Sequence, residues 1–294
     1  MVISPDVSDL PYSIENGVKY FELTAEPVTR EILPGVFING WGYNGSIPGP
    51  TIQVYTGDRV RIRVINRLPE ATSVHWHGLD IPNAMDGVPE MEPSPAIEPG
   101  SHLDYQFKIV NPPGTHMYHA HMNSGIQQMM GLGGGFIILD RNRRDMVKHD
   151  YFLMVGEFTL KGLEMGEVKP GVYDLDTMSH DFNFFTVNGR CFPFTTPLDV
   201  MQGETMRIRL GNIGHDAHPM HIHGHQFVIT ASDGNPMPVR IFKNTINVAS
   251  GETYDIVFTA NNPGNWPFHC HVPHHMTNNM RSEMGGMVTA IHYN

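Results

Sequence analysis

Cysteine is scarce in this sequence, and long apolar runs and clusters of basic residues are absent. Only Cys191 and Cys270 occur among the 294 residues, so a framework of disulfides is not indicated. No stretch of 18 or more apolar residues occurs, and we therefore expect no membrane span. The formal net charge of −11 and the lack of a basic run argue against nucleic acid and anionic membranes as partners.

Helical periodicity is also scarce, and the start of the sequence lacks the features of a targeting signal. The first ten residues, MVISPDVSDL, lack the charged and apolar regions of a signal peptide. The chain is then either a cytosolic protein or a mature form whose signal has been removed. Its 30 glycines and 23 prolines separate short apolar runs, which is typical of a protein rich in β-strands.

The two halves of the sequence resemble each other. PTIQVYTGDRVRIRVIN, which begins at Pro50, aligns with PLDVMQGETMRIRLGN, which begins at Pro197, and GTHMYHAH further on aligns with GNWPFHCH. We therefore predict two homologous domains, residues 1–145 and 146–294. Apolar and polar residues alternate within each half, as in RVRIRV after Asp58. Each domain should be an antiparallel β-sandwich or Greek-key barrel, which makes the fold class all-β.

Histidine is abundant, and many of the 18 histidines form pairs separated by one residue. The pairs are His75 and His77, His119 and His121, His221 and His223, and His269 and His271. Alternate side chains of a strand point to the same face, so each pair would present two imidazoles together. One such pair is weak support for a metal site. Four pairs at matching positions of two homologous halves favour metal binding, because clustered imidazoles need partners.

The cysteine inside the last pair would face the opposite way. In WPFHCHVPHHM, an extended HCH segment places Cys270 on one face and the flanking histidines on the other. Cys270 can thus belong to a second metal site that is only a few bonds from the first. A cysteine with two histidines and a distant methionine is the ligand set of blue copper. The candidates are His218, Cys270, His275 and Met280.

The first half has no such cysteine set. At the positions that match His218, Cys270 and His275 it has Thr72, Ala120 and Gly125. Zinc stays open for an isolated site of three histidines, but it does not account for the set that contains the cysteine.

The motifs HWHG, HAHM, HPMHIHGH and HCHVPHHMTNNM resemble the four copper-binding motifs of multicopper oxidases. With two domains only, the chain is similar to the two-domain, small laccase-like members of that family, with type 1 copper in domain 2. The resemblance covers nearly the whole chain. It implies two cupredoxin-like domains and four coppers per subunit: one type 1, one type 2 and two type 3.

The resemblance also implies which residues bind each copper. Type 1 copper would be held by His218, Cys270, His275 and Met280, and type 2 copper by His75 and His221. The type 3 pair would be held by His77, His119, His121, His223, His269 and His271.

The family further implies a mechanism. A donor gives electrons singly at type 1 copper, with His275 as the entry ligand, and they pass through Cys270 to the cluster that reduces dioxygen to water. Asp86 matches an acidic residue that some members place near the cluster, where it would relay protons. The alternative for Asp86 is a structural turn residue before Gly87. Met276 stands where some bacterial members have a glutamate, which puts a proton path at that position in doubt.

Two-domain members place the cluster between domain 1 of one subunit and domain 2 of the next, so a homotrimer is implied.

The reducing substrate is open: a phenol, an aromatic amine, a metal ion such as cuprous ion, or a small nitrogen compound. A periplasmic or secreted location is favoured, because copper sites assemble more readily there than in a copper-poor cytosol. We expect Cys191 and the methionines near the motifs to pack in the interior.

Two other functions are open at this point. A copper nitrite reductase is also a trimer of two-domain chains. That family has its type 1 cysteine in domain 1, where this chain has Ala120, and it would leave the type 3 histidines unexplained. A copper-storage or electron-carrier protein would bind copper without consuming oxygen, and it would need no three-copper cluster.

Overall fold

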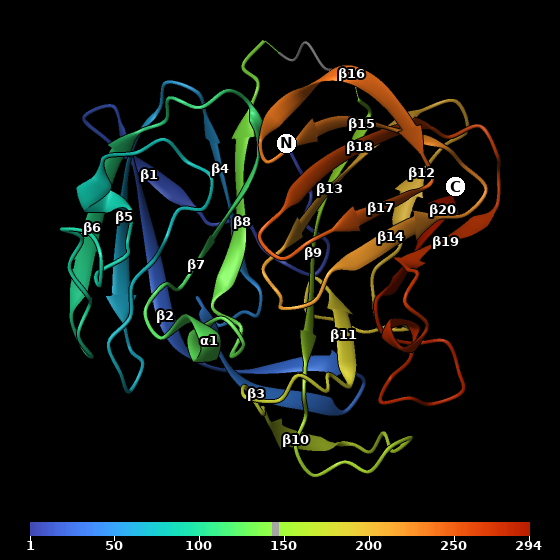
Figure 1. Cartoon of the computed structure of the whole chain (residues 1–294). Helices are drawn as coiled ribbons and strands as arrows, with labels where there is room; N and C mark the ends of the chain where they lie inside the picture. Colours follow the sequence, from blue (N-terminus) through green and yellow to red (C-terminus); the bar gives the residue numbers. More distant parts are fainter. Residues whose placement is uncertain (143–146) are drawn as a thin grey trace.

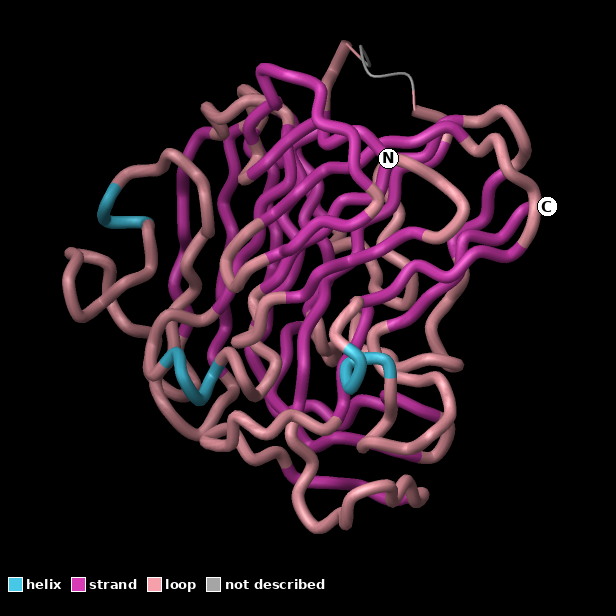
Figure 2. Tube along the Cα trace, turned by 45° about the vertical axis from the view of Figure 1, so that its right-hand side comes forward, coloured by secondary structure: helices cyan, strands magenta, loops and turns pink. Residues whose placement is uncertain are grey.

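The computed structural model of the chain describes residues 1–142 and 147–294 and consists mainly of β-strands and loops (Figure 2). The first half contains β1 (Tyr12–Glu15), β2 (Val18–Leu33), β3 (Val36–Tyr43), β4 (Gly49–Tyr55), β5 (Arg59–Asn66), β6 (His102–Lys108), β7 (Gly114–His119) and β8 (Gly133–Leu139). The second half contains β9 (His149–Phe158), β10 (Gly171–Asp174), β11 (Phe184–Val187), β12 (Leu198–Val200), β13 (Thr205–Asn212), β14 (His218–Ile222), β15 (Phe227–Ser232), β16 (Asn235–Lys243), β17 (Thr245–Val248), β18 (Thr253–Thr259), β19 (Asn265–Cys270) and β20 (Val288–Tyr293). The helical segments are single turns: η1 (Asn83–Met85), α1 (Ser124–Gln127) and η2 (Pro273–Met276). The predicted all-β class is confirmed.

Two sheets enclose the core of the first half. One has the order β10-β3-β2-β5-β6, with β1 joined to β2, and the other has the order β4-β8-β7. In β5 the apolar residues Val60, Ile62 and Val64 are buried, while the arginines between them are more exposed. The alternation in the sequence therefore turns one face of the strand to the core.

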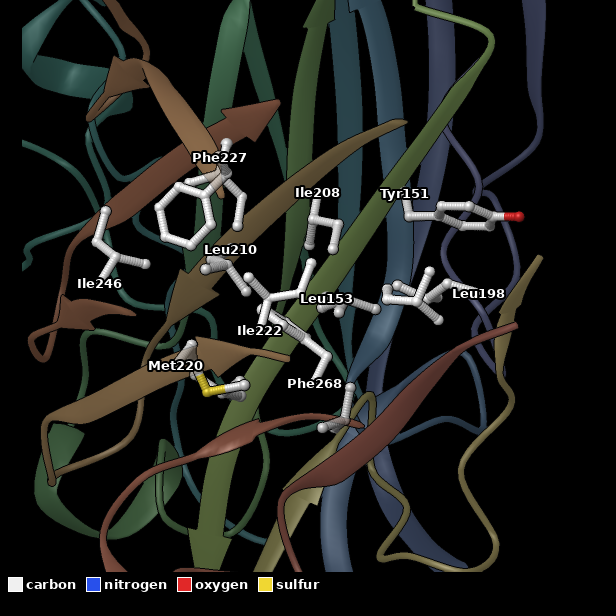
Figure 3. Packing of buried hydrophobic residues seen from close by; sticks show 14 of the residues in the cluster. Tyr151, Leu153, Leu198, Ile208, Leu210, Met220, Ile222, Phe227, Ile246 and Phe268 are labelled. Carbon is white, nitrogen blue, oxygen red and sulfur yellow. The ribbon is translucent and has the colours of Figure 1, made fainter. Parts of the chain in front are cut away.

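The second half is also built of two sheets, with the orders β11-β9-β13-β18-β15-β16 and β12-β20-β19-β14-β17. Figure 3 shows the core between them, with Leu153, Ile208 and Ile222 among the buried side chains. β14 and β19, which carry four of the eight predicted ligands of this half, are antiparallel neighbours in one sheet.

One strand of the second half completes a sheet of the first. β10 pairs in parallel with β3, with Gly171 opposite Val36 (Figure 1). Near the N-terminus, Ile3 forms a β-bridge with Tyr151 of the second half. The two halves therefore exchange backbone contacts in both directions.

A buried apolar cluster lies where the two halves meet. It contains Ile32 and Ile38 from the first half and Phe158 and Phe184 from the second. Cys191 is fully buried in the same cluster, which confirms the packing role expected for it. The domain boundary predicted between residues 145 and 146 lies outside the described residues. Among the described residues no helix is long and apolar enough to cross a membrane.

Candidate metal centres

Three ligand side chains of the second half converge in its interior. His218 begins β14, Cys270 ends β19, and His275 lies in the single turn η2 that follows. The Nδ1 atoms of His218 and His275 are 3.2 Å apart, and the Cys270 sulfur is 3.3 Å from His275 Nδ1 and 3.9 Å from His218 Nδ1. All three residues are buried. We call this group the cysteine site.

Burial controls protonation in the cysteine site. It raises the pKa of the Cys270 thiol to about 12, with a further contribution from the carboxylates of Glu157 and Asp216. Burial, together with the neighbouring His218, lowers the pKa of His275 to about 3. The site therefore offers a neutral imidazole at His275 and a thiol that gives up its proton when a cation binds. Two imidazoles and one thiolate are the donors that suit copper.

Met280, the predicted methionine ligand of the cysteine site, is largely exposed, whereas the other ligands of that site are buried. The Met280 side chain is 52% exposed. It lies in a loop, and the backbone of Met280 has a positive φ of 62°. Met287 is fully buried instead, and its backbone bonds to both ligand segments: its amide donates to the His275 carbonyl (2.9 Å) and its carbonyl accepts from the Cys270 amide (3.1 Å). A thioether ligand has to reach this buried site, so Met287 is a second candidate beside Met280, whose role as a ligand stays a prediction.

The four histidines of the first half form a second group, the first histidine quartet (His75, His77, His119 and His121). His75 and His119 face each other across a β-bridge, with backbone hydrogen bonds in both directions. His77 Nδ1 lies 3.2 Å from His119 Nε2, and the rings of His75 and His121 are 5.5 Å apart. Ring nitrogens of His75, His77 and His119 all lie within 4.8 Å of one another, which is close enough to share a metal ion.

The second histidine quartet (His221, His223, His269 and His271) lies on β14 and β19 and just after them. The strand register sets His221 opposite His269. His223 Nε2 and His269 Nε2 are 2.9 Å apart, and the rings of His221 and His271 are 5.5 Å apart. Cys270 belongs to the cysteine site while its two neighbours belong to this quartet. The alternation expected for the HCH segment is therefore present.

Hydrogen bonds orient several of these rings. His75 Nδ1 is 3.0 Å from the Asp86 carbonyl and 3.4 Å from the Asp86 carboxylate. His221 Nδ1 lies 2.8 Å from the Asn244 carbonyl and 2.9 Å from the Thr245 hydroxyl. Each contact occupies Nδ1 and leaves Nε2 as the nitrogen for a metal, which is the usual support of a metal-binding histidine. Asn244 and Thr245 lie outside every motif, and nothing in the sequence marks them.

Burial also lowers the pKa of imidazoles in both quartets. The pKa of His119 falls to about 3, and the pKa values of His77 and His269 are lowered as well, because a buried imidazolium is poorly solvated. The pKa of the more exposed His223 is lowered by partial desolvation and by the neighbouring His221 and His271. Neutral imidazoles are the form that binds metals.

Within residues 1–142 and 147–294, the ring contacts among these eight histidines join members of the same quartet only. His223 and His271 are exposed at the surface of the second half. A site that needs histidines of both quartets is therefore not assembled among the described residues of one chain.

Comparison with known proteins gives the family. Models of multicopper oxidase domains match residues 24–143 and 165–285. The multicopper oxidase mco of Staphylococcus epidermidis is 32% identical over 267 residues, covering 87% of this chain and 56% of that protein. A probable nitrite reductase-hydroxylamine oxidoreductase fusion protein of Kuenenia stuttgartiensis is 29% identical, covering 90% of this chain and 31% of that protein. The chain thus spans 31% to 56% of the length of these two relatives.

A solved structure extends the likeness to the whole fold. The multicopper oxidase mgLAC superposes with a TM-score of 0.82 at 32% identity, and the match covers 94% of this chain and 86% of that one. The cupredoxin-like fold expected from the motifs is thereby confirmed. With both halves matched by domain models and the cysteine site and quartets in place, the chain belongs to the multicopper oxidase family.

Proposed function

We propose that this chain is a laccase-like oxidase that couples one-electron oxidation of a small donor to the reduction of dioxygen to water. One observation carries the proposal. Cys270 lies in the cysteine site, while the residues bonded to it, His269 and His271, lie in the second histidine quartet. Two candidate metal sites thus share one tripeptide, which gives a short covalent path between them.

The donor atoms support an assignment of each site. His218, Cys270 and His275 would hold type 1 copper, and the buried Met287 is a candidate for the methionine ligand beside the predicted Met280. His75 and His221 would hold type 2 copper, and His77, His119, His121, His223, His269 and His271 would hold the type 3 pair, which makes four coppers per subunit. When bound, copper supplies the one-electron redox chemistry that protein side chains lack.

Two residues would act around these sites. The Nε2 of His275 lies 3.8 Å from Asp216, which is partly exposed, so a donor would approach His275 from this side. The carboxylate of Asp86 lies 3.4 Å from His75 and is also partly exposed. It can hold a proton at the edge of the first histidine quartet and pass it inward. The donor itself stays open among phenols, aromatic amines, metal ions and small nitrogen compounds, and a periplasmic or secreted location stays a prediction.

A homotrimer would complete the oxygen-reducing cluster. Each chain offers one quartet from each half, and the second quartet is partly exposed. If the first quartet of one subunit meets the second quartet of the next, the head-to-tail contact can close as a ring.

The test is to load the protein with copper and measure copper per chain, the EPR spectrum and oxygen consumption with a phenol donor. We expect four coppers, one type 1 signal, one type 2 signal and an EPR-silent pair. In Cys270→Ser the blue absorption and the type 1 signal should disappear, and oxygen consumption should fall at least about a hundredfold, because the thiolate ligand and the covalent path are both lost.

Other outcomes would point elsewhere. Two EPR-visible coppers per chain with nitrite turnover under anaerobic conditions would favour a nitrite reductase, a function that the name of the Kuenenia relative suggests for that protein. Copper binding and reversible reduction without oxygen consumption would favour an electron carrier.

A further inference from the structure

Glu157 is a buried carboxylate near the end of a strand whose central residues are apolar. It is the ninth residue of β9, which reads HDYFLMVGEF, and its side chain is 0% exposed. A buried carboxylate is costly unless it is fully hydrogen-bonded. The contacts of Glu157 therefore indicate what it does.

Three donors face this carboxylate. Oε2 lies 2.9 Å from His218 Nε2, whose side chain is also 0% exposed. Oε1 accepts hydrogen bonds from the backbone amides of His215 and Asp216, the latter at 3.0 Å. With both oxygens engaged as acceptors, His218 carries its proton on Nε2. Its Nδ1 is then left as a lone pair facing Cys270 and His275.

The register of β9 against β11 links Glu157 indirectly to the second imidazole of the cysteine site. Glu157 pairs across the sheet with Phe185 of β11. The ring of Phe185 stacks on His275 at 3.9 Å between centroids. One residue pair on two adjacent strands thus supports both histidines of the site.

We propose that Glu157 is a positioning residue that fixes the tautomer of His218 and lowers the reduction potential of the copper held by the cysteine site. The inference rests on the proposed function. A buried negative charge behind a ligand stabilises the more positive, oxidised state. A hydrogen bond from Nε2 to a carboxylate also makes the imidazole a stronger donor, which acts in the same direction.

The test is the reduction potential of Glu157→Gln, measured by redox titration of the blue absorption in copper-loaded protein. At the wild-type midpoint, we expect the ratio of oxidised to reduced copper to fall at least about tenfold, which corresponds to a rise of about 59 mV for a one-electron couple. The matched control is Glu204→Gln. It removes the same charge from another carboxylate–histidine pair of this half, in which His149 Nε2 lies 2.6 Å from Glu204, and it should leave the potential unchanged.

A second variant displaces the carboxylate without removing it. A Cβ atom at Gly214 would collide with both oxygens of Glu157. Gly214→Ala should therefore raise the potential in the same direction by a smaller amount. If Glu157→Gln does not take up copper, Gly214→Ala decides the question, and a wild-type potential in that variant overturns the proposal.

A further measurement needs no copper. In copper-free protein labelled with ¹⁵N-histidine, the His218 resonance, assigned by its loss in His218→Gln, should show the proton on Nε2. A proton on Nδ1 would overturn the proposal. An unchanged potential in a blue Glu157→Gln protein, or an equal shift in Glu204→Gln, would do the same. If wild-type protein never turns blue, the proposed function fails and the tautomer measurement still tests Glu157.

Discussion

At the scale of single residues, Met280 and Met287 carry the same side chain but differ in burial, and burial bears on which of them can reach the cysteine site. Met280 follows the polar run TNN in an exposed loop, whereas Met287 directly precedes the buried strand β20. Spacing from His275 alone favours Met280. The backbone folds the intervening segment outward and returns at Met287, beside both ligand segments.

Substitution can separate the two methionines. We expect Met287→Leu to raise the potential of copper held by the cysteine site and to shift its visible absorption, because a weak thioether donor that would favour the oxidised state is lost. The change conserves volume, so the free energy of unfolding should fall by less than about 1.5 kcal/mol. Met280→Leu is the matched control and should behave as wild type in redox titration. The opposite pattern, with an effect at Met280 and none at Met287, would support the prediction made from spacing.

The histidine pairs could be predicted from the sequence, because the two-residue period of a strand acts locally. The same period separates Cys270 from His269 and His271. Glu157 could not be predicted, because its partner His218 lies 61 residues further along the chain and only the pairing of strands brings them together. A single glutamate in the apolar run YFLMVGEF was the available signal, and it does not name a partner.

At the scale of elements, β16 lies at the edge of a six-stranded sheet and is exposed along nearly its whole length. Val239 is 61% and Phe242 67% exposed. Phe242 and Arg240 line a cavity of about 830 Å³ together with His221 and His223. An open strand edge with apolar side chains is a ready site for association. Here it adjoins the quartet that the proposed trimer would cover.

Phe242→Glu should therefore weaken the assembly. A buried charge at a subunit contact is unfavourable, so we expect the mass measured by light scattering to shift from trimer toward monomer, with loss of type 2 and type 3 copper. The blue type 1 copper should remain, because the cysteine site lies within one chain. Met165→Glu introduces the same negative charge in place of an exposed apolar side chain outside this cavity. It should leave the trimer intact. An unaltered trimer in Phe242→Glu would place the contact elsewhere.

At the scale of the whole molecule, the repeat of the sequence predicts two β-rich domains, and each half buries an apolar cluster of its own. The alternation of apolar residues carries that information within each strand. It does not carry the order of strands, and β10 is the clearest case: four residues that follow the second half's first strand join a sheet of the first half. This pairing joins strand edges that are far apart along the chain, so the sequence around β10 contains no pattern that predicts it.

Complementation between damaged subunits tests the proposed placement of the cluster. His77→Ala impairs the first quartet and His223→Ala the second, so each protein alone should lose oxygen consumption. Co-expressed chains should regain part of it, because an intact first quartet of one subunit can meet an intact second quartet of its neighbour.

Two variants altered in the same quartet, His77→Ala and His121→Ala, provide the control and should not rescue each other. A cluster formed within one chain would give no recovery in either mixture, and a monomeric active enzyme would exclude the trimer outright.

The pairing of β10 with β3 also limits how this gene can be rearranged. A recombination event near residue 146 that exchanged the second half for that of a relative would also exchange the strand that covers β3. The recombined protein would fold only if the β10 strand of the relative can pair with the edge of β3. The two halves should therefore be inherited together, and substitutions on the facing strands should accumulate in step.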